Sequence, residues 1–135
     1  MDRILIVDDE FLIRYTLEEG LKDRGYDAYS AATVEEGLEF VRKYHPGVLL
    51  LDNLLENSVG MDEIVNFKNA DEELQVIMMT AYGAVSQAVE ATKRGAYDYI
   101  LKPFDVDEID MLIKRCLEQK RNRDSLVFLK GDVPQ

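Results

Sequence analysis

The segment GVLLLDN, residues 47–53, decides the fold of this chain. Four consecutive aliphatic residues, Val48 to Leu51, lead directly into Asp52, and an amide side chain follows at Asn53. An apolar run of this length, rich in valine and leucine, is typical of a strand buried on both faces of a parallel sheet. Asp52 would then emerge at the carboxyl end of the sheet, the edge where open α/β folds bind their ligands.

Three other apolar segments also end in polar side chains. They are residues 3–7, which precede Asp8 and Asp9, residues 76–79, which precede Thr80, and residues 97–101, which precede Lys102. Because the carboxyl ends of parallel strands lie at one edge of a sheet, we expect the acids, the hydroxyl and the amine to meet there. This convergence is the main argument for a functional site.

Helical periodicity fills the intervals between these strands. The predicted helices cover residues 11–24, a segment that follows the capping residue Thr33 and stops before Pro46, residues 61–69, residues 83–94, and a last segment capped by Asp105 or Asp107. A weaker alternation over residues 26–30 predicts a fifth strand. Five strands alternating with five helices predict a doubly wound, flavodoxin-like α/β fold, a five-stranded parallel sheet of order 2-1-3-4-5 with helices on both faces. In that order the strands that carry Asp8 and Asp52 are neighbours.

Composition limits the partners and the location that we expect. The 135 residues suit one domain, and the formal net charge of −11 repels phosphate backbones and anionic lipid, so we expect no direct binding of nucleic acid or membrane. The apolar runs are too short for a transmembrane helix and the start lacks the marks of a signal peptide, which predicts a soluble, cytoplasmic protein. Cys116, the only cysteine, falls on an apolar helical stripe and is predicted to pack in the core. His45 is expected at the surface.

Crowded carboxylates repel one another, and a hard cation such as Mg²⁺, which prefers oxygen ligands, relieves that repulsion. A neighbouring hydroxyl and ammonium supply the donors that phosphoryl transfer requires. With its charge balanced, one carboxylate can act as the nucleophile and form an acyl phosphate, and Asp52 on the central strand is best placed. Taken singly, each of these side chains could be a helix cap, a packed hydroxyl or a solvated charge. Their joint position at four strand ends favours a site.

The chain closely resembles the receiver domain of two-component response regulators from Met1 to about Arg121. The run MTAYGAVSQAVEATKRGAYDYILKPF, residues 79–104, is most similar to receivers of the nitrogen-regulatory, enhancer-binding class. The motifs that carry the resemblance are Asp8-Asp9, Asp52 after three leucines, Thr80-Ala81, residues 95–99 and Lys102-Pro103-Phe104. The resemblance implies a regulatory domain that catalyses only its own phosphotransfer and dephosphorylation and is not otherwise an enzyme.

It also implies a role for each site residue. Asp52 would accept a phosphoryl group from the phosphohistidine of a sensor histidine kinase, and Thr80 and Lys102 would bind the phosphoryl oxygens. The implied Mg²⁺ ligands are Asp8, Asp9, Asp52 and the backbone carbonyl of Leu54. Thr80 and an inward-turning Tyr99 would signal to the surface of helix four, strand five and helix five, through which the chain could form a homodimer. The bond between Lys102 and Pro103 would be cis.

The predicted loop after Asp52 departs from the family. Glu56 stands where receivers usually carry proline. Leu54 and Tyr82 occupy the two positions that tend to govern hydrolysis of the acyl phosphate, and neither readily orients a water. We therefore predict slow dephosphorylation; a phosphoryl half-life of seconds, measured by loss of label, would contradict it.

We divide the chain into a receiver over residues 1–123 and a segment over residues 124–135. That segment either packs back on the domain or begins a linker to an absent output domain, which in this class is usually an ATPase followed by a DNA-binding domain, so the output is expected to be transcriptional. Two alternatives stay open. One is a pseudo-receiver that binds partners without phosphorylation, and the other is an aspartyl-nucleophile phosphatase, against which Leu54 argues because those enzymes carry an acid there.

Overall fold

In the computed structural model, which describes residues 2–55, 58–81 and 85–132, five parallel strands form one sheet. The strands are β1 (Arg3–Val7), β2 (Asp27–Ala31), β3 (Val48–Asp52), β4 (Gln75–Thr80) and β5 (Asp98–Leu101). Their order is β2-β1-β3-β4-β5, which confirms the predicted topology. The central strand β3 is buried along its whole length, as its unbroken apolar run predicted.

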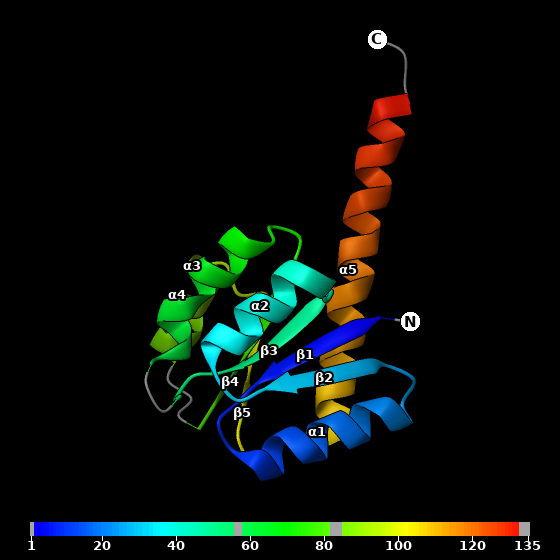
Figure 1. Cartoon of the computed structure of the whole chain (residues 1–135). Helices are drawn as coiled ribbons and strands as arrows, with labels where there is room; N and C mark the ends of the chain where they lie inside the picture. Colours follow the sequence, from blue (N-terminus) through cyan, green and yellow to red (C-terminus); the bar gives the residue numbers. More distant parts are fainter. Residues whose placement is uncertain (1, 56–57, 82–84, 133–135) are drawn as a thin grey trace.

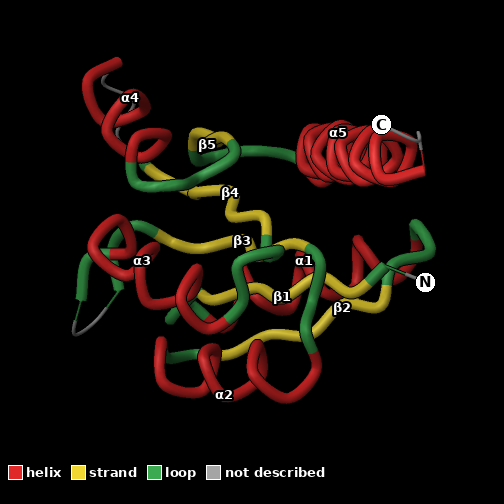
Figure 2. The backbone as a smooth tube through the Cα atoms, turned by 90° about the horizontal axis from the view of Figure 1, so that it is seen from above, coloured by secondary structure: helices red, strands yellow, loops and turns green. Residues whose placement is uncertain are grey.

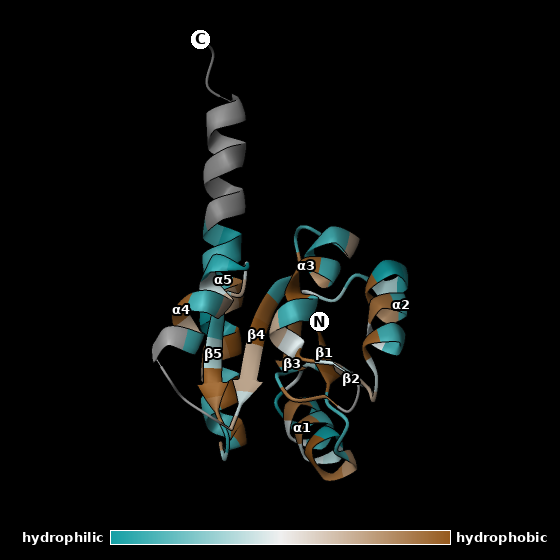
Figure 3. Ribbon diagram, turned by 90° about the vertical axis from the view of Figure 1, so that its left-hand side faces the viewer, coloured by the Kyte–Doolittle hydropathy of each residue, from teal (hydrophilic) through white to brown (hydrophobic). Residues whose placement is uncertain are grey.

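Helices cover both faces of the sheet (Figures 1 and 2). They are α1 (Phe11–Asp23), α2 (Val34–Tyr44), α3 (Gly60–Ala70), α4 (Val85–Lys93) and α5 (Val106–Asp132). Buried side chains of α1 and α5 pack with one face of the strands, while those of α2, α3 and α4 pack with the other. In Figure 3 the shaft of β4 and the head of β5 are brown, the colour of hydrophobic residues, and much of the helical surface is teal, the colour of hydrophilic residues.

The ends of several helices follow from single residues. The hydroxyl of Thr33 accepts a hydrogen bond from the N–H of Glu36 at 3.2 Å, which caps α2 as predicted. Asp105, rather than Asp107, caps α5, because its carboxylate accepts a bond from the N–H of Glu108 at 2.9 Å. His45 ends α2 in the left-handed conformation with φ of 47°, and its side chain is exposed, as expected.

Several boundaries differ from the prediction. Strand β2 lies one residue further along the chain than the alternation indicated, since it begins at Asp27, and β4 extends beyond the predicted residues 76–79 to include Gln75 and Thr80. Residues 83 and 84 of the fourth predicted helix lie outside the described residues. The largest difference is at the C-terminus, where α5 continues past Arg123 to Asp132 and projects beyond the sheet (Figure 1). The backbone of residues 124–132 therefore continues a helix instead of folding back on the domain.

Cys116 is fully buried, and burial raises the pKa of its thiol to about 11 from 9.0. A rise of about two units lowers the thiolate fraction at neutral pH about 100-fold, and the thiolate is the reactive form. We expect the native protein to react with a thiol-specific disulfide reagent at least 100-fold more slowly than the protein unfolded in guanidinium. Equal rates in the two states would contradict the burial.

None of the described helices is long and apolar enough to cross a membrane.

Candidate functional site at the carboxyl edge of the sheet

The predicted site residues meet at the carboxyl edge of the sheet. Parallel pairing sets Val7 beside Leu51, so that Asp8 and Asp52 leave neighbouring strands at the same level. Asp8 is fully buried and Asp52 is 4% exposed. Lys102 follows strand β5 at the same edge of the sheet. The backbone N–H of Lys102 donates to the carbonyl of Thr80 at 2.7 Å. Four strands thus supply the acids, the hydroxyl and the amine.

The ammonium of Lys102 lies between the two buried acids. Its Nζ donates to Oδ2 of Asp8 at 3.1 Å and to Oδ1 of Asp52 at 3.0 Å. The Lys102 side chain is 16% exposed, so these ion pairs are largely shielded from water. The residues that this one amine joins are 94 and 50 positions away in the sequence. The peptide bond from Lys102 to Pro103 is cis, as the resemblance implies.

Backbone contacts hold Asp8 in place. Its Oδ1 accepts a hydrogen bond from the N–H of Glu10 at 2.9 Å, and its own N–H donates to the carbonyl of Ala31 at 3.2 Å. The guanidinium of Arg14 donates to the Asp8 carbonyl at 2.7 Å. The first bond holds the carboxylate through Oδ1 and the other two hold the Asp8 backbone, while Oδ2 accepts the bond from Lys102.

Burial and charge act in opposite directions on the pKa values of this cluster. Burial raises the pKa of Asp52, and the nearby charge of Asp8 adds to that rise, while the Lys102 ammonium and the backbone N–H of Leu54 lower it; the net pKa is raised. For Lys102, burial lowers the pKa, but the hydrogen bonds and charges of Asp52 and Asp8 outweigh it and the net pKa is raised. The lysine is therefore held as an ammonium.

The acidic residues fit a divalent cation. Asp8, Asp9 and Asp52 each offer a carboxylate oxygen, and these oxygens lie within 4.8 Å of one another. In an octahedral Mg²⁺ site with bonds of about 2.1 Å, opposite ligands stand about 4.2 Å apart, so a small contraction would close the shell. Three carboxylates and the Lys102 ammonium together leave two negative charges for the ion to balance. Asp9 is exposed, which leaves the site open to solvent on that side.

Hydrogen bonds connect Asn53, the residue after Asp52, to the start of α3. The N–H of Gly60 donates to the carbonyl of Asn53 at 2.7 Å, and the side-chain oxygen of Asn53 accepts from the N–H of Met61 at 3.1 Å. Leu54 forms an isolated bridge with Val59 and is 56% exposed. Glu56, where the family pattern is broken, lies outside the described residues. The predicted ligand role of the Leu54 carbonyl stays a prediction.

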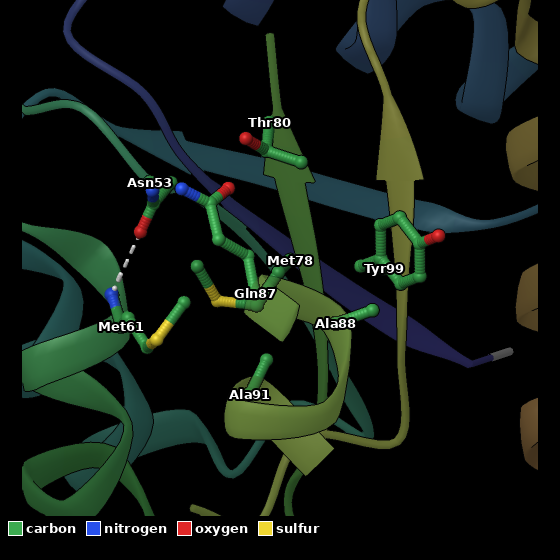
Figure 4. A pocket seen from close by; sticks show the side chains of 8 residues that line it. All are labelled: Asn53, Met61, Met78, Thr80, Gln87, Ala88, Ala91 and Tyr99. Atoms are coloured by element: carbon green, nitrogen blue, oxygen red, sulfur yellow. Dashed lines mark hydrogen bonds between the residues drawn. The ribbon is translucent and has the colours of Figure 1, made fainter. Parts of the chain in front are cut away.

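Thr80 and Tyr99 line the same small pocket between β4, β5, α3 and α4, which has a volume of about 10 Å³ (Figure 4). The other lining residues are Asn53, Met61, Met78, Gln87, Ala88 and Ala91. Thr80 is 7% exposed and Tyr99 is half-buried. The sequence pattern marked Asn53 only as the amide after Asp52, and it did not single out Gln87, because Gln87 stands neither at a strand end nor on an apolar stripe.

A flavodoxin-like sheet with a half-buried lysine between two aspartates at its carboxyl edge is the arrangement that the motif resemblance implied for a receiver domain. A family profile described as the response regulator receiver domain matches residues 4–114. The chain belongs to this family, for which phosphorylation on an aspartate is characteristic. The resemblance stated from the motifs is thereby confirmed.

Relatives and solved structures agree with this assignment. The chain is 38% identical to the sporulation initiation phosphotransferase F of Bacillus subtilis over 90% of its own length and 98% of the relative. It is 36% identical to the nitrogen assimilation regulatory protein NtrX of Azorhizobium caulinodans over 94% of its length. It covers only 28% of that regulator.

Among structures, the crystal structure of NtrX from Brucella abortus matches 98% of this chain with a TM-score of 0.90 at 32% identity, and the chain spans 31% of it. The solution structure of the beryllofluoride-activated NtrC4 receiver domain dimer matches 89% of this chain with a TM-score of 0.83 at 33% identity. This similarity to NtrX-type and NtrC-type receivers supports the nitrogen-regulatory, enhancer-binding subclass.

Proposed function

We propose that this chain is a phosphorylation-controlled receiver in which Asp52 is the phosphoacceptor. The donor is a phosphohistidine of a sensor histidine kinase: its P–N bond breaks with the electron pair going to the imidazole nitrogen, and a P–O bond forms to a carboxylate oxygen of Asp52. The observation that carries this proposal is the placement of the Lys102 ammonium 3.0 Å from Asp52 Oδ1, where it would also bind an oxygen of the incoming phosphoryl group.

Asp8, Asp9, Asp52 and the backbone carbonyl of Leu54 would hold Mg²⁺, which supplies charge neutralisation and a template for the transferred group when bound. Thr80 would bind a second phosphoryl oxygen, and Tyr99, beside it in the same pocket, would follow its movement. Two features support this part of the proposal: the carboxylate oxygens within 4.8 Å of one another, and the position of Thr80 at the end of β4.

The proposal is tested with Mg²⁺ and either beryllofluoride or acetyl phosphate. We expect the wild-type protein to form a stoichiometric adduct that is lost in Asp52→Asn, and Mg²⁺ alone to raise the melting temperature, because it binds the folded acid cluster. A wild-type protein that gains no adduct is instead a pseudo-receiver, and continuous turnover of acetyl phosphate points to a phosphatase. Retention of the adduct in Asp52→Asn would show that another residue is the phosphoacceptor.

A kinase would reach Asp52 across the groove between α1 and the segment after β5. Glu10, Leu12 and Ile13 line this groove on one side, and Lys102 and Phe104 line it on the other. The groove has a volume of about 500 Å³. The exposed large apolar side chains on the outer part of α1 are Phe11, Leu12 and Tyr15. Apolar side chains exposed together beside a polar site are typical of a protein interface.

We therefore expect Leu12→Glu to lower the rate of phosphotransfer from the histidine kinase about tenfold or more, with beryllofluoride binding unchanged. Leu12 is 73% exposed, so the substitution leaves the core intact. Met111→Glu is the matched control, because Met111 is 63% exposed on α5. Equal rates for the two variants would place the kinase contact elsewhere.

We infer a cytoplasmic domain, residues 1–123, that controls a transcriptional output domain or partner through its α4–β5–α5 surface, with residues 124–135 as the start of a linker. The NtrC4 receiver, a dimer when activated by beryllofluoride, supports a homodimer of this chain through that surface. Light scattering of the Mg²⁺-beryllofluoride form tests it, with a doubled mass as the expected result.

A further inference from the structure

The pocket that Thr80 and Tyr99 line also receives a side chain from α4. Figure 4 shows the carboxamide of Gln87 pointing from the first turn of this helix toward Thr80 and Asn53. Three α4 residues line the pocket, namely Gln87, Ala88 and Ala91, and of these Gln87 is the polar one. A carboxamide both donates and accepts hydrogen bonds, so it can pair with a hydroxyl and with a second amide.

The two groups that Gln87 faces differ in how firmly they are held. The side-chain oxygen of Asn53 accepts a bond from the N–H of Met61 at 3.1 Å, which fixes Asn53 against the start of α3. Thr80 ends strand β4, and in the proposed mechanism its hydroxyl moves to the phosphoryl group. Gln87 therefore stands between a fixed amide and a hydroxyl whose position would report phosphorylation.

Outside this pocket, few strong contacts hold helix α4 against the domain. The contacts of the Gln87 carboxamide can therefore affect the position of the helix. Ala91 is 3% exposed, and an alanine buries little apolar area, whereas the larger Val89 is 48% exposed. Just beyond the helix, Arg94 forms ion pairs with Asp62 of α3 at 2.7 Å and with Glu90 at 2.9 Å. These three charged side chains are 40% to 66% exposed, and such solvent-accessible pairs contribute little each.

From this arrangement we propose that Gln87 is a positioning residue through which α4 responds to Thr80. In the unphosphorylated protein its carboxamide holds the first turn of α4 against Thr80 and Asn53. When the phosphoryl group draws Thr80 away, Gln87 loses one partner and α4 is released. The role rests on the proposed function, because it requires Thr80 to move.

The test compares Gln87→Leu and Gln87→Met with the wild-type protein. If Gln87 stabilises the unphosphorylated arrangement, its loss raises the population that is competent for activation, and the apparent affinity for beryllofluoride rises with it. We expect both variants to bind beryllofluoride, in excess Mg²⁺, about three- to tenfold more tightly, the range that the net effect of one hydrogen bond supports. Gln119→Leu is the matched control, since Gln119 is an exposed glutamine on α5.

Amide hydrogen exchange of α4 separates this role from a general stabilisation of the helix. The α4 amides of Gln87→Leu should exchange faster than those of the wild type in Mg²⁺ alone, and the difference should vanish with beryllofluoride bound. Unchanged affinity, or an exchange difference that persists in both states, would overturn the role of Gln87 while leaving Asp52 as the phosphoacceptor. Absence of a wild-type adduct would overturn both.

Discussion

Replacing Lys102 with methionine should destabilise the metal-free protein by about 3 kcal/mol or more, because the buried carboxylates of Asp8 and Asp52 would lose the ammonium between them. The same replacement should strengthen Mg²⁺ binding, since the ion would no longer share the acids with a competing cation. Chemical denaturation with EDTA and then with millimolar Mg²⁺ measures both effects: Mg²⁺ should stabilise the variant more than the wild type.

Lys102→Met should also lower the rate of phosphorylation, although it strengthens Mg²⁺ binding. Loss of one charged donor to the transferred group lowers such rates about 100-fold or more, so Lys102→Met should react slowly with acetyl phosphate despite binding Mg²⁺ well. Lys114→Met is the control, because Lys114 pairs with Asp110 at 3.2 Å but its side chain is 67% exposed. Such a pair contributes about 0.5 kcal/mol. Similar losses of stability in the two variants would show that the Lys102 cluster is not energetically special.

Gly60→Ala should disrupt both the fold and the site. A Cβ atom at Gly60 would lie 2.1 Å from the carbonyl oxygen of Asp52 and 3.0 Å from Cα of Asn53. These are backbone atoms, which cannot rotate out of the way as a flexible side chain can. The turn that carries Asp52 must therefore open, and we expect a loss of about 3 kcal/mol in the free energy of unfolding.

The affinity for beryllofluoride should fall in the same variant, because the acceptor carboxylate moves with its backbone. Gly47→Ala supplies the control, since a Cβ there would meet Leu117 Cδ2 at 3.5 Å, an ordinary contact. We expect that control to lose less than about 1 kcal/mol. The outcome that contradicts the argument is a Gly60→Ala protein with wild-type stability and wild-type adduct formation.

The strand order and the residues of the acid cluster could be predicted from the sequence alone. An apolar run that ends in a polar residue marks both a buried strand and the direction of its carboxyl end, so Asp8, Asp52, Thr80 and Lys102 could be placed at one edge without coordinates. Local side-chain chemistry also gave the Thr33 cap and the buried position of Cys116. These features depend on residues a few positions apart in the chain.

Other features depended on distances that no local pattern encodes. Periodicity left the choice between Asp105 and Asp107 as the cap of α5 open, and the hydrogen bond to Glu108 decided it. The predicted division of the chain after Arg123 did not include a continuous helix, yet α5 continues to Asp132. Side-chain composition did not reveal this continuation, because the backbone bonds of a helix do not depend on an apolar stripe.

By itself, then, the order of apolar and polar residues determined the parallel sheet, its reactive edge and the side chains that gather there, because strand periodicity fixes which way each segment points. Only the tertiary structure decided that Lys102 sits between Asp8 and Asp52, that Gly60 touches the Asp52 backbone and that Gln87 faces Thr80. The physical reason is that these contacts join residues that are distant in the chain. Their separations are set by strand register and the paths of the connecting turns, which sequence periodicity does not specify.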